Sequence, residues 1–115
     1  MLPNLDTFYE RLQYAKEQNV PGTRWNVIAN RVGIDKANFS RYKNGKYFPS
    51  AVTLLKIARV LQVDARWLAG KDIVFPEDGL ELFTIMFEAL DDDGKEEVLS
   101  VFELYFGSGY TVEGN

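Results

Sequence analysis

The residues with the clearest chemical potential form the ten-residue stretch DKANFSRYKN, residues 35–44. If this stretch is helical, Phe39 and Tyr42 mark one apolar edge, and small or polar side chains occupy the other edge. On that polar edge, Arg41 could donate two hydrogen bonds to the O6 and N7 atoms of guanine, and Ala37 could contact a thymine methyl group. The pattern indicates a helix that is anchored by one edge and presents the other to base edges. An ordinary amphipathic surface helix has the same pattern, so these ten residues alone leave both interpretations open.

Charge is distributed unevenly along the chain. The 115 residues include 13 basic and 17 acidic side chains, so the formal net charge is −4. Residues 1–71 contain twelve basic and five acidic side chains and carry +7, whereas residues 72–115 contain one basic and twelve acidic side chains and carry −11. Residues 36–63 contain six basic side chains and no acidic one. A basic stretch inside a folded domain favours a polyanionic partner, and a solvated lysine-rich surface is the alternative.

Composition excludes several classes of protein. The chain is 46% hydrophobic, which suits one small packed domain with an appendage. It contains no cysteine and no histidine, which excludes disulfides, thiol nucleophiles and imidazole ligands or bases. The three aspartates of residues 91–93 could bind a divalent metal, but capping of a helix explains them. We therefore expect no enzyme, no metal and no cofactor.

The N-terminal segment and the hydropathy pattern bear on localisation. The segment MLPNLDTFYE lacks a basic stretch followed by an apolar one, so it is not expected to be a signal peptide. No apolar run approaches the roughly 20 residues that span a bilayer. We expect a cytoplasmic protein that does not contact a membrane.

Apolar spacing predicts an all-α fold, because helical periodicity recurs and strand alternation is absent. Thr7 and Glu10 have capping-box spacing, and Gly33 is placed to end a helix. The helix that follows Ser50 is apolar on most sides, as a central buried helix would be. Helices are expected over about residues 7–18, 23–32, 35–44, 51–61 and 65–69, the last being a short turn capped by Asp64.

The second and third of these helices are separated only by Gly33 and Ile34. Two short helices joined by a tight turn, the second rich in basic and polar residues, have the layout of a helix-turn-helix. In that motif the second helix lies in the major groove of DNA and the first crosses behind it.

The stretch from Thr23 to Gly70 resembles the helix-turn-helix domain of the lambdoid-phage repressor and Cro family, also called the XRE family. With the first helix included, the resemblance covers residues 5–71, and its six marks occur in the family's order and spacing. The marks are Ala29 and Gly33 in IANRVGI, Ser40 and Arg41 in NFSRYKNGK, Asn44-Gly45-Lys46, Pro49-Ser50, LLKIARVLQV, and ARWLAGKD. The resemblance implies a five-helix lambda-repressor-like DNA-binding domain whose third helix enters the major groove.

Two sets of residues are expected at the DNA. The base-facing positions that the resemblance implies are Lys36, Ala37, Ser40 and Arg41, to which the short polar side chain of Asn38 is added. The phosphate-facing positions that it implies are Arg24, Trp25, Asn44 and Lys46, to which the neighbouring Asn26 and Lys43 are added. Trp25 departs from the family, which usually has glutamine there. Its indole could donate a hydrogen bond or stack on a sugar, or it could belong to the core, and both remain open.

The C-terminal part is expected to contain a linker, residues 72–79, a helical hairpin, residues 80–106, and a flexible tail, residues 107–115. The first hairpin helix has two apolar stripes, and a hairpin needs only one for its own seam. The second stripe must be covered by the first domain or by another chain. We expect another chain, in a homodimer or a higher even oligomer. The expected interface residues are Leu82, Phe83, Met86, Phe87, Leu99, Phe102, Tyr105 and Phe106.

The sequence thus predicts a regulator of transcription that binds double-stranded DNA sequence-specifically. The resemblance implies a phage or prophage repressor that binds a palindromic operator as a dimer. The alternative is an antitoxin-type protein-binding module that grips a basic partner with its acidic hairpin and also binds DNA. No small-molecule ligand is expected in either case.

Overall fold

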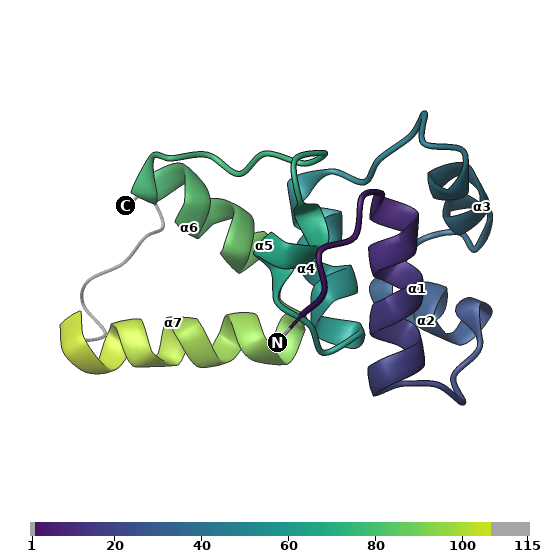
Figure 1. The fold of residues 1–115 in the computed structure, drawn as a ribbon. Helices are drawn as coiled ribbons and strands as arrows, with labels where there is room; N and C mark the ends of the chain where they lie inside the picture. The colour runs from purple at the N-terminus through teal and green to yellow at the C-terminus, as the bar shows by residue number, and fades with distance from the viewer. Residues whose placement is uncertain (1, 107–115) are drawn as a thin grey trace.

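The computed structural model describes residues 2–106, with side chains as far as Leu104, and every regular element in this range is helical (Figure 1). The all-α prediction is confirmed, and the helices begin and end within two residues of the expected positions. The helices are α1 (Phe8–Asn19), α2 (Trp25–Val32), α3 (Ala37–Lys43), α4 (Ala51–Val60), α5 (Ala65–Ala69), α6 (Gly79–Glu88) and α7 (Asp92–Phe106). No helix in this range is both long and apolar enough to cross a membrane. The predicted tail, residues 107–115, lies outside the described residues.

Side-chain caps set where several helices begin. Thr7 and Glu10 form both hydrogen bonds of the capping box at the start of α1. Ser50 accepts a hydrogen bond from the backbone N–H of Thr53 in α4, and Asp64 accepts two from backbone N–H groups of α5. Each cap satisfies donors that a helix leaves unpaired at its first turn, so local sequence chemistry fixes these boundaries.

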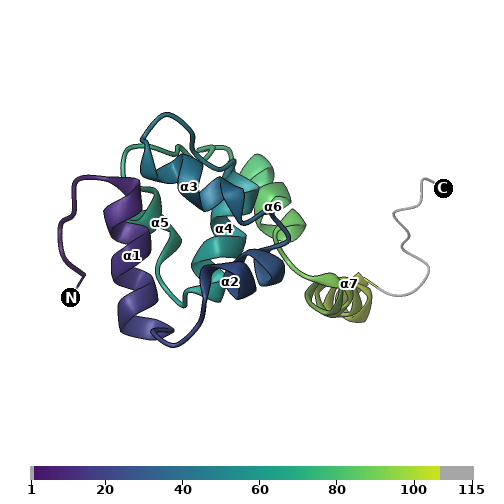
Figure 2. The ribbon, with the colours of Figure 1, turned by 90° about the vertical axis from the view of Figure 1, so that its right-hand side faces the viewer.

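The core is organised around α4, which packs against α2, α5 and α6, while α1 packs against α3 and α5 (Figure 2). The apolar periodicity of each helix puts its large side chains on the side that faces this centre. The residues that form the core are Phe8, Leu12, Ala15, Ile28, Ala29, Val32, Phe39, Tyr42, Leu54, Ile57, Ala58, Leu61, Leu68, Ala69 and Ile73.

A tight turn joins α2 to α3. Gly33 has a φ of 87°, in the left-handed region that glycine adopts without strain, and it ends α2 as expected. The backbone N–H groups of Gly33 and Ile34 both donate to the carbonyl oxygen of Ala29. Asp35 then accepts a hydrogen bond from the backbone N–H of Ala37 at 2.9 Å and so helps to begin α3. Four residues, 33–36, thus join α2 to α3.

A buried arginine links α1 to the segment after α5. Arg11 of α1 is only 4% exposed, and its guanidinium donates to four acceptors that come from three parts of the chain. Nε donates to the carbonyl of Leu68 at 2.9 Å, and Nη1 donates to the carbonyl of Leu5 at 2.9 Å. Nη2 donates to the carbonyl of Ala69 at 3.3 Å and pairs with a carboxylate oxygen of Asp72 at 2.7 Å. We call this arrangement the Arg11 clasp.

The expected linker is partly anchored to the first domain. Asp72 belongs to the Arg11 clasp, Ile73 is buried in the core, and Phe75 packs against the core from outside. The boundary expected at residue 71 therefore falls too early. The reason is that residues 72–75 hold the partners of a buried charge and of an apolar patch, which their composition does not reveal.

The two C-terminal helices do not form the expected hairpin seam. α6 packs on α4, whereas α7 runs away from α6 and from the first domain (Figures 1 and 2). Asp91 begins α7, with one carboxylate oxygen accepting from the backbone N–H of Gly94 at 2.8 Å and the other 3.5 Å from Arg59 of α4. α4 packs against one side of α6, and near the turn between α6 and α7 the ammonium group of Lys95 lies 6.0 Å from the centre of the Phe87 ring.

The Arg11 clasp predicts a large effect on folding stability. Arg11→Met keeps much of the side-chain volume but leaves three carbonyls and the Asp72 carboxylate without their donor. We expect the free energy of unfolding to fall by about 3 kcal/mol in urea denaturation. Glu17→Met, an exposed change on the same helix, should alter it by less than about 0.5 kcal/mol. Equal stability of the Arg11→Met and Glu17→Met variants would contradict a stabilising role for the clasp.

Candidate nucleic-acid interface

The outer edge of α3 carries the residues expected to face bases. The side chains of Lys36, Ala37, Ser40 and Arg41 are exposed, and Asn38 is half-buried. Ala37, Ser40 and Arg41 lie opposite the buried edge of the helix, Lys36 precedes its first turn, and Asn38 lies beside the buried edge, where its side-chain oxygen accepts a hydrogen bond from Arg41. In Figure 2, α3 and α2 lie on the face of the molecule that is turned toward the viewer.

Aromatic contacts hold the inner edge of α3 in place. The ring of Phe39 meets that of Tyr42 edge-on at 5.7 Å, and Tyr42 meets Phe8 of α1 edge-on at 5.5 Å. Such edge-to-face pairs add to the apolar burial of the rings. Because these rings are buried, α3 cannot rotate about its own axis without breaking the core, and its polar edge is held outward.

Trp25 at the start of α2 is largely a packing residue. Its ring lies 4.6 Å from that of Phe39, it is half-buried, and it packs against the core. The ammonium group of Lys16 lies 5.7 Å from the centre of the same ring. Of the two interpretations that the sequence left open, the geometry favours the core one for the ring.

The remaining phosphate-facing candidates flank α3. Arg24 and Asn26 are exposed at the start of α2, which begins without a side-chain cap. At the C-terminal end of α3 and in the loop that follows, the exposed candidates are Lys43, Asn44 and Lys46. The start of α2 has no side-chain cap and lies beside the basic side chain of Arg24, an arrangement that suits an anion.

The guanidinium of Arg41 is held by neutral groups. Nη1 donates to the side-chain oxygen of Asn38 at 3.1 Å, and the guanidinium carbon lies 5.9 Å from the centre of the Tyr47 ring. In the described part of the chain, Arg41 takes part in no ion pair. Its charge is therefore available to a partner.

Tyr47 was not singled out from the sequence. It is 46% exposed, and its ring stacks on that of Tyr42 with an interplanar angle of 8° and a centre-to-centre distance of 5.7 Å. Burial, and then the neighbouring Tyr47, raise the pKa of Tyr42 to about 12, so Tyr42 stays neutral at physiological pH. An exposed aromatic directly after Lys46 in a basic loop was the signal that could have identified Tyr47.

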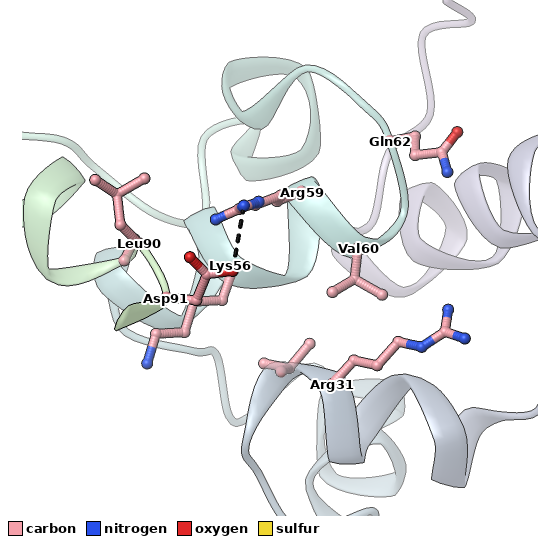
Figure 3. A pocket seen from close by; sticks show the side chains of 9 residues that line it. Arg31, Lys56, Arg59, Val60, Gln62, Leu90 and Asp91 are labelled. Atoms are coloured by element: carbon pink, nitrogen blue, oxygen red, sulfur yellow. Dashed lines mark hydrogen bonds and ion pairs between the residues drawn. The ribbon is translucent and has the colours of Figure 1, made fainter. Parts of the chain in front are cut away.

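A second group of basic side chains lies between α2, α4 and the turn before α7. Arg31, Lys56 and Arg59 line a cavity of about 400 Å³ there, together with Asp91 (Figure 3). Figure 3 shows that Arg31 and Lys56 point away from one another, while Arg59 faces Asp91. These cations do not converge on one point, and the pair between Arg59 and Asp91 is exposed and contributes little stability.

The acidic turn also fails to form a metal site. Within residues 2–106 no group of three or more carboxylates is placed to hold a metal ion. Asp91 is occupied by capping α7 and by facing Arg59, and Asp92 and Asp93 lie in the first helical turn. Carboxylates at this position complement the positive end of the helix.

The apolar surface expected at the dimer interface is exposed in the single chain. Phe83, Met86 and Leu99 are 56%, 52% and 46% exposed, and α6 has no buried residue. Leu82, Phe87 and Phe102 are half-buried, and the side chains of Tyr105 and Phe106 lie outside the described residues. Three further exposed residues belong to the same helices and were not expected: Leu80, Val101 and Leu104.

Comparison with protein-family models, with curated proteins and with solved structures finds no match to this chain.

Proposed function

We propose that this protein is a sequence-specific regulator of transcription that binds double-stranded DNA with α3 in the major groove. The observation that carries the proposal is the exposed polar edge of α3. Arg41 on this edge forms no ion pair with the residues that the structure describes, and Phe39 and Tyr42 are buried in the core behind it. A rigid helix with accessible bidentate donors and small side chains suits base edges in that groove. The resemblance to the lambdoid-phage repressor and Cro family supports the same proposal.

Electrostatics supports the orientation of this helix on DNA. Basic or polar side chains flank α3 on both sides, and residues 36–63 contain no acid to repel phosphate. The acidic helix α7 extends away from α2 and α3 (Figure 1). Most of α7 is therefore directed away from α2 and α3, whereas Asp91 before its first turn lines a cavity with Arg31 of α2 and pairs there with Arg59. The phosphate contacts we propose are Arg24, Asn26, Lys43, Asn44 and Lys46, with Trp25 serving mainly to pack α2 on α3.

The apolar surface of α6 and α7 supports a homodimer. Monomeric proteins rarely expose several large apolar side chains on adjoining helices, and here Leu80, Phe83 and Met86 share one short helix. A two-fold pair of helix-turn-helix domains would bind two half-sites of a palindrome. This would raise the affinity that one short reading helix provides. A repressor of phage or prophage type is the specific role we propose.

A second candidate, an antitoxin-type module, draws support from α7 alone. This helix has exposed apolar residues together with Glu96, Glu97 and Glu103, so it would suit a partner protein with a basic, apolar groove. The two candidates differ in oligomeric state: the regulator is a dimer on its own, whereas the module would leave α7 uncovered until its partner binds. Sedimentation of the purified chain distinguishes them.

Selection of bound sites from random duplex DNA tests the main proposal. We expect recovery of a palindromic motif with half-sites about one helical turn apart, centre to centre. Recovery of no motif, with binding that depends only on DNA length and salt, would leave a non-specific polyanion binder instead.

Arg41→Ala should relax the preference at one base pair of each half-site. We expect the selected base to lose about 1–3 kcal/mol of discrimination there, because the two hydrogen bonds to guanine disappear. Competition binding with duplexes that differ at single positions measures this loss. The same loss of affinity on every sequence would place Arg41 at the backbone and not at a base.

Lys46→Ala should weaken binding to all sequences alike. Removing one phosphate contact should make the slope of log affinity against log salt shallower by about one unit. Titration at several salt concentrations measures the slope, and Lys71→Ala serves as a control because Lys71 is outside the proposed interface. If the slope is unchanged in the Lys46 variant, this residue does not neutralise a phosphate.

Phe83→Glu should convert the dimer into a folded monomer, because it puts a charge in the proposed apolar interface at an already exposed position. Affinity for a full palindrome should fall by about a hundredfold as the benefit of two linked half-sites is lost. Analytical ultracentrifugation reports the mass. Leu2→Glu is the matched control, since Leu2 is also an exposed apolar residue but belongs to the segment before α1 and not to α6 or α7. A Phe83→Glu variant that sediments as a dimer would exclude α6 from the interface.

A further inference from the structure

We infer that Tyr47 is a positioning residue for Arg41, holding its guanidinium in the orientation in which it reads guanine. This inference rests on the proposed function and goes beyond it, because it assigns part of the base specificity to a residue in the loop after α3. It is argued from three linked contacts that lead from the core to the surface.

The first contact fixes the inner end of the arrangement. Tyr42 is 2% exposed, and its ring meets those of Phe8 and Phe39 edge-on. A side chain packed in this way has a single position. Tyr42 therefore provides a rigid platform at the base of the loop.

The second contact joins the buried Tyr42 to the partly exposed Tyr47. The ring of Tyr47 lies parallel to the ring of Tyr42, at an angle of 8°, with the centres 5.7 Å apart. At this spacing parallel rings are offset, which is a favoured aromatic arrangement. Gly45, with a φ of 72°, supplies the left-handed turn after α3 that other residues would adopt only with strain. The loop thereby brings Tyr47 back beside the helix although its side chain is half exposed.

The third contact acts on the arginine. The guanidinium carbon of Arg41 lies 5.9 Å from the centre of the Tyr47 ring, which is within the range of a cation–π attraction. On the α3 side, Nη1 donates to Asn38 at 3.1 Å. The guanidinium is thus held by a ring and by an amide oxygen, and one of its five N–H donors is used. The others stay available for the two acceptors of guanine.

The benefit of this arrangement is a smaller loss of side-chain freedom on binding. A free arginine side chain has many rotamers, and ordering it opposes the hydrogen bonds that it makes. If Tyr47 has already ordered Arg41, the guanine contact is formed at a lower entropic cost. Tyr47 should therefore matter for discrimination at the guanine that Arg41 contacts and much less at other base pairs.

The inference is tested with Tyr47→Leu and Tyr47→Phe, each alone and combined with Arg41→Ala. The probe is a duplex of the site recovered by selection, compared with the same duplex in which the G·C pair that responds to Arg41→Ala is replaced by A·T. We expect Tyr47→Leu to reduce the preference for G·C about fivefold. Tyr47→Phe should restore most of it, and Tyr47→Leu should have no further effect once Arg41 is alanine.

Three outcomes would overturn the inference while leaving the proposed function intact. In the first, Tyr47→Leu weakens binding equally on both duplexes, which would make Tyr47 a general backbone contact. In the second, Tyr47→Phe is as defective as Tyr47→Leu, which would assign the effect to the hydroxyl group. In the third, the effects of Tyr47→Leu and Arg41→Ala are additive, which would show that the two side chains act independently.

A measurement without DNA separates this inference from the proposed function. In the free protein, the ring current of Tyr47 should shift the side-chain proton resonances of Arg41, and the shift should persist in Tyr47→Phe and vanish in Tyr47→Leu. Identical Arg41 resonances in all three proteins would overturn the positioning role whether or not DNA binds. Failure of selection to yield any motif would overturn the proposed function, and the resonances would still decide whether Tyr47 orders Arg41.

Discussion

The burial of Phe39 and Tyr42 beneath α1 and α2 is the constraint on which the proposed interface depends. Phe8 closes on Tyr42, and Trp25 lies against Phe39, so the rotation of α3 about its axis is set by rings on two other helices. A helix of seven residues has little stability of its own and takes its position from packing. The polar edge of α3 is exposed because the opposite edge, with Phe39 and Tyr42, is buried in the core.

Much of the fold could be predicted because it is encoded locally. Capping residues such as Thr7 and Asp64, the stop at Gly33 and the apolar periodicity all act over a few residues, and they placed each helix to within two residues. The features that the sequence analysis missed depend on residues far apart in the sequence. Arg11 lies on the same helical stripe as the core residues of α1, which should have indicated a buried charge, but its acceptors are as many as 61 residues away. The divergence of α6 and α7 was likewise missed, because it depends on the packing of α6 against α4, which is distant in the sequence.

The candidate site shows the same division. The exposure of Ala37, Ser40 and Arg41 on α3 follows from helical geometry, so it could be predicted from the sequence, and their contact with bases stays a proposal. The contacts of Tyr47 could not be predicted from the sequence, because they require the loop after α3 to turn back at Gly45 and place the Tyr47 ring on that of Tyr42. The charge separation was visible in the sequence as well, but the direction of α7, away from α2 and α3, is a property of the folded chain (Figure 1).

The Arg11 clasp also bears on the order in which the chain matures during synthesis. The acceptors at Leu68, Ala69 and Asp72 emerge from the ribosome long after the guanidinium that they hold. Until then the nascent N-terminal helix carries an unsatisfied cation on the side that must become the interior, and burying it would be unfavourable. The first domain can therefore reach its final packing only once residues 68–72, which lead toward α6, have been translated.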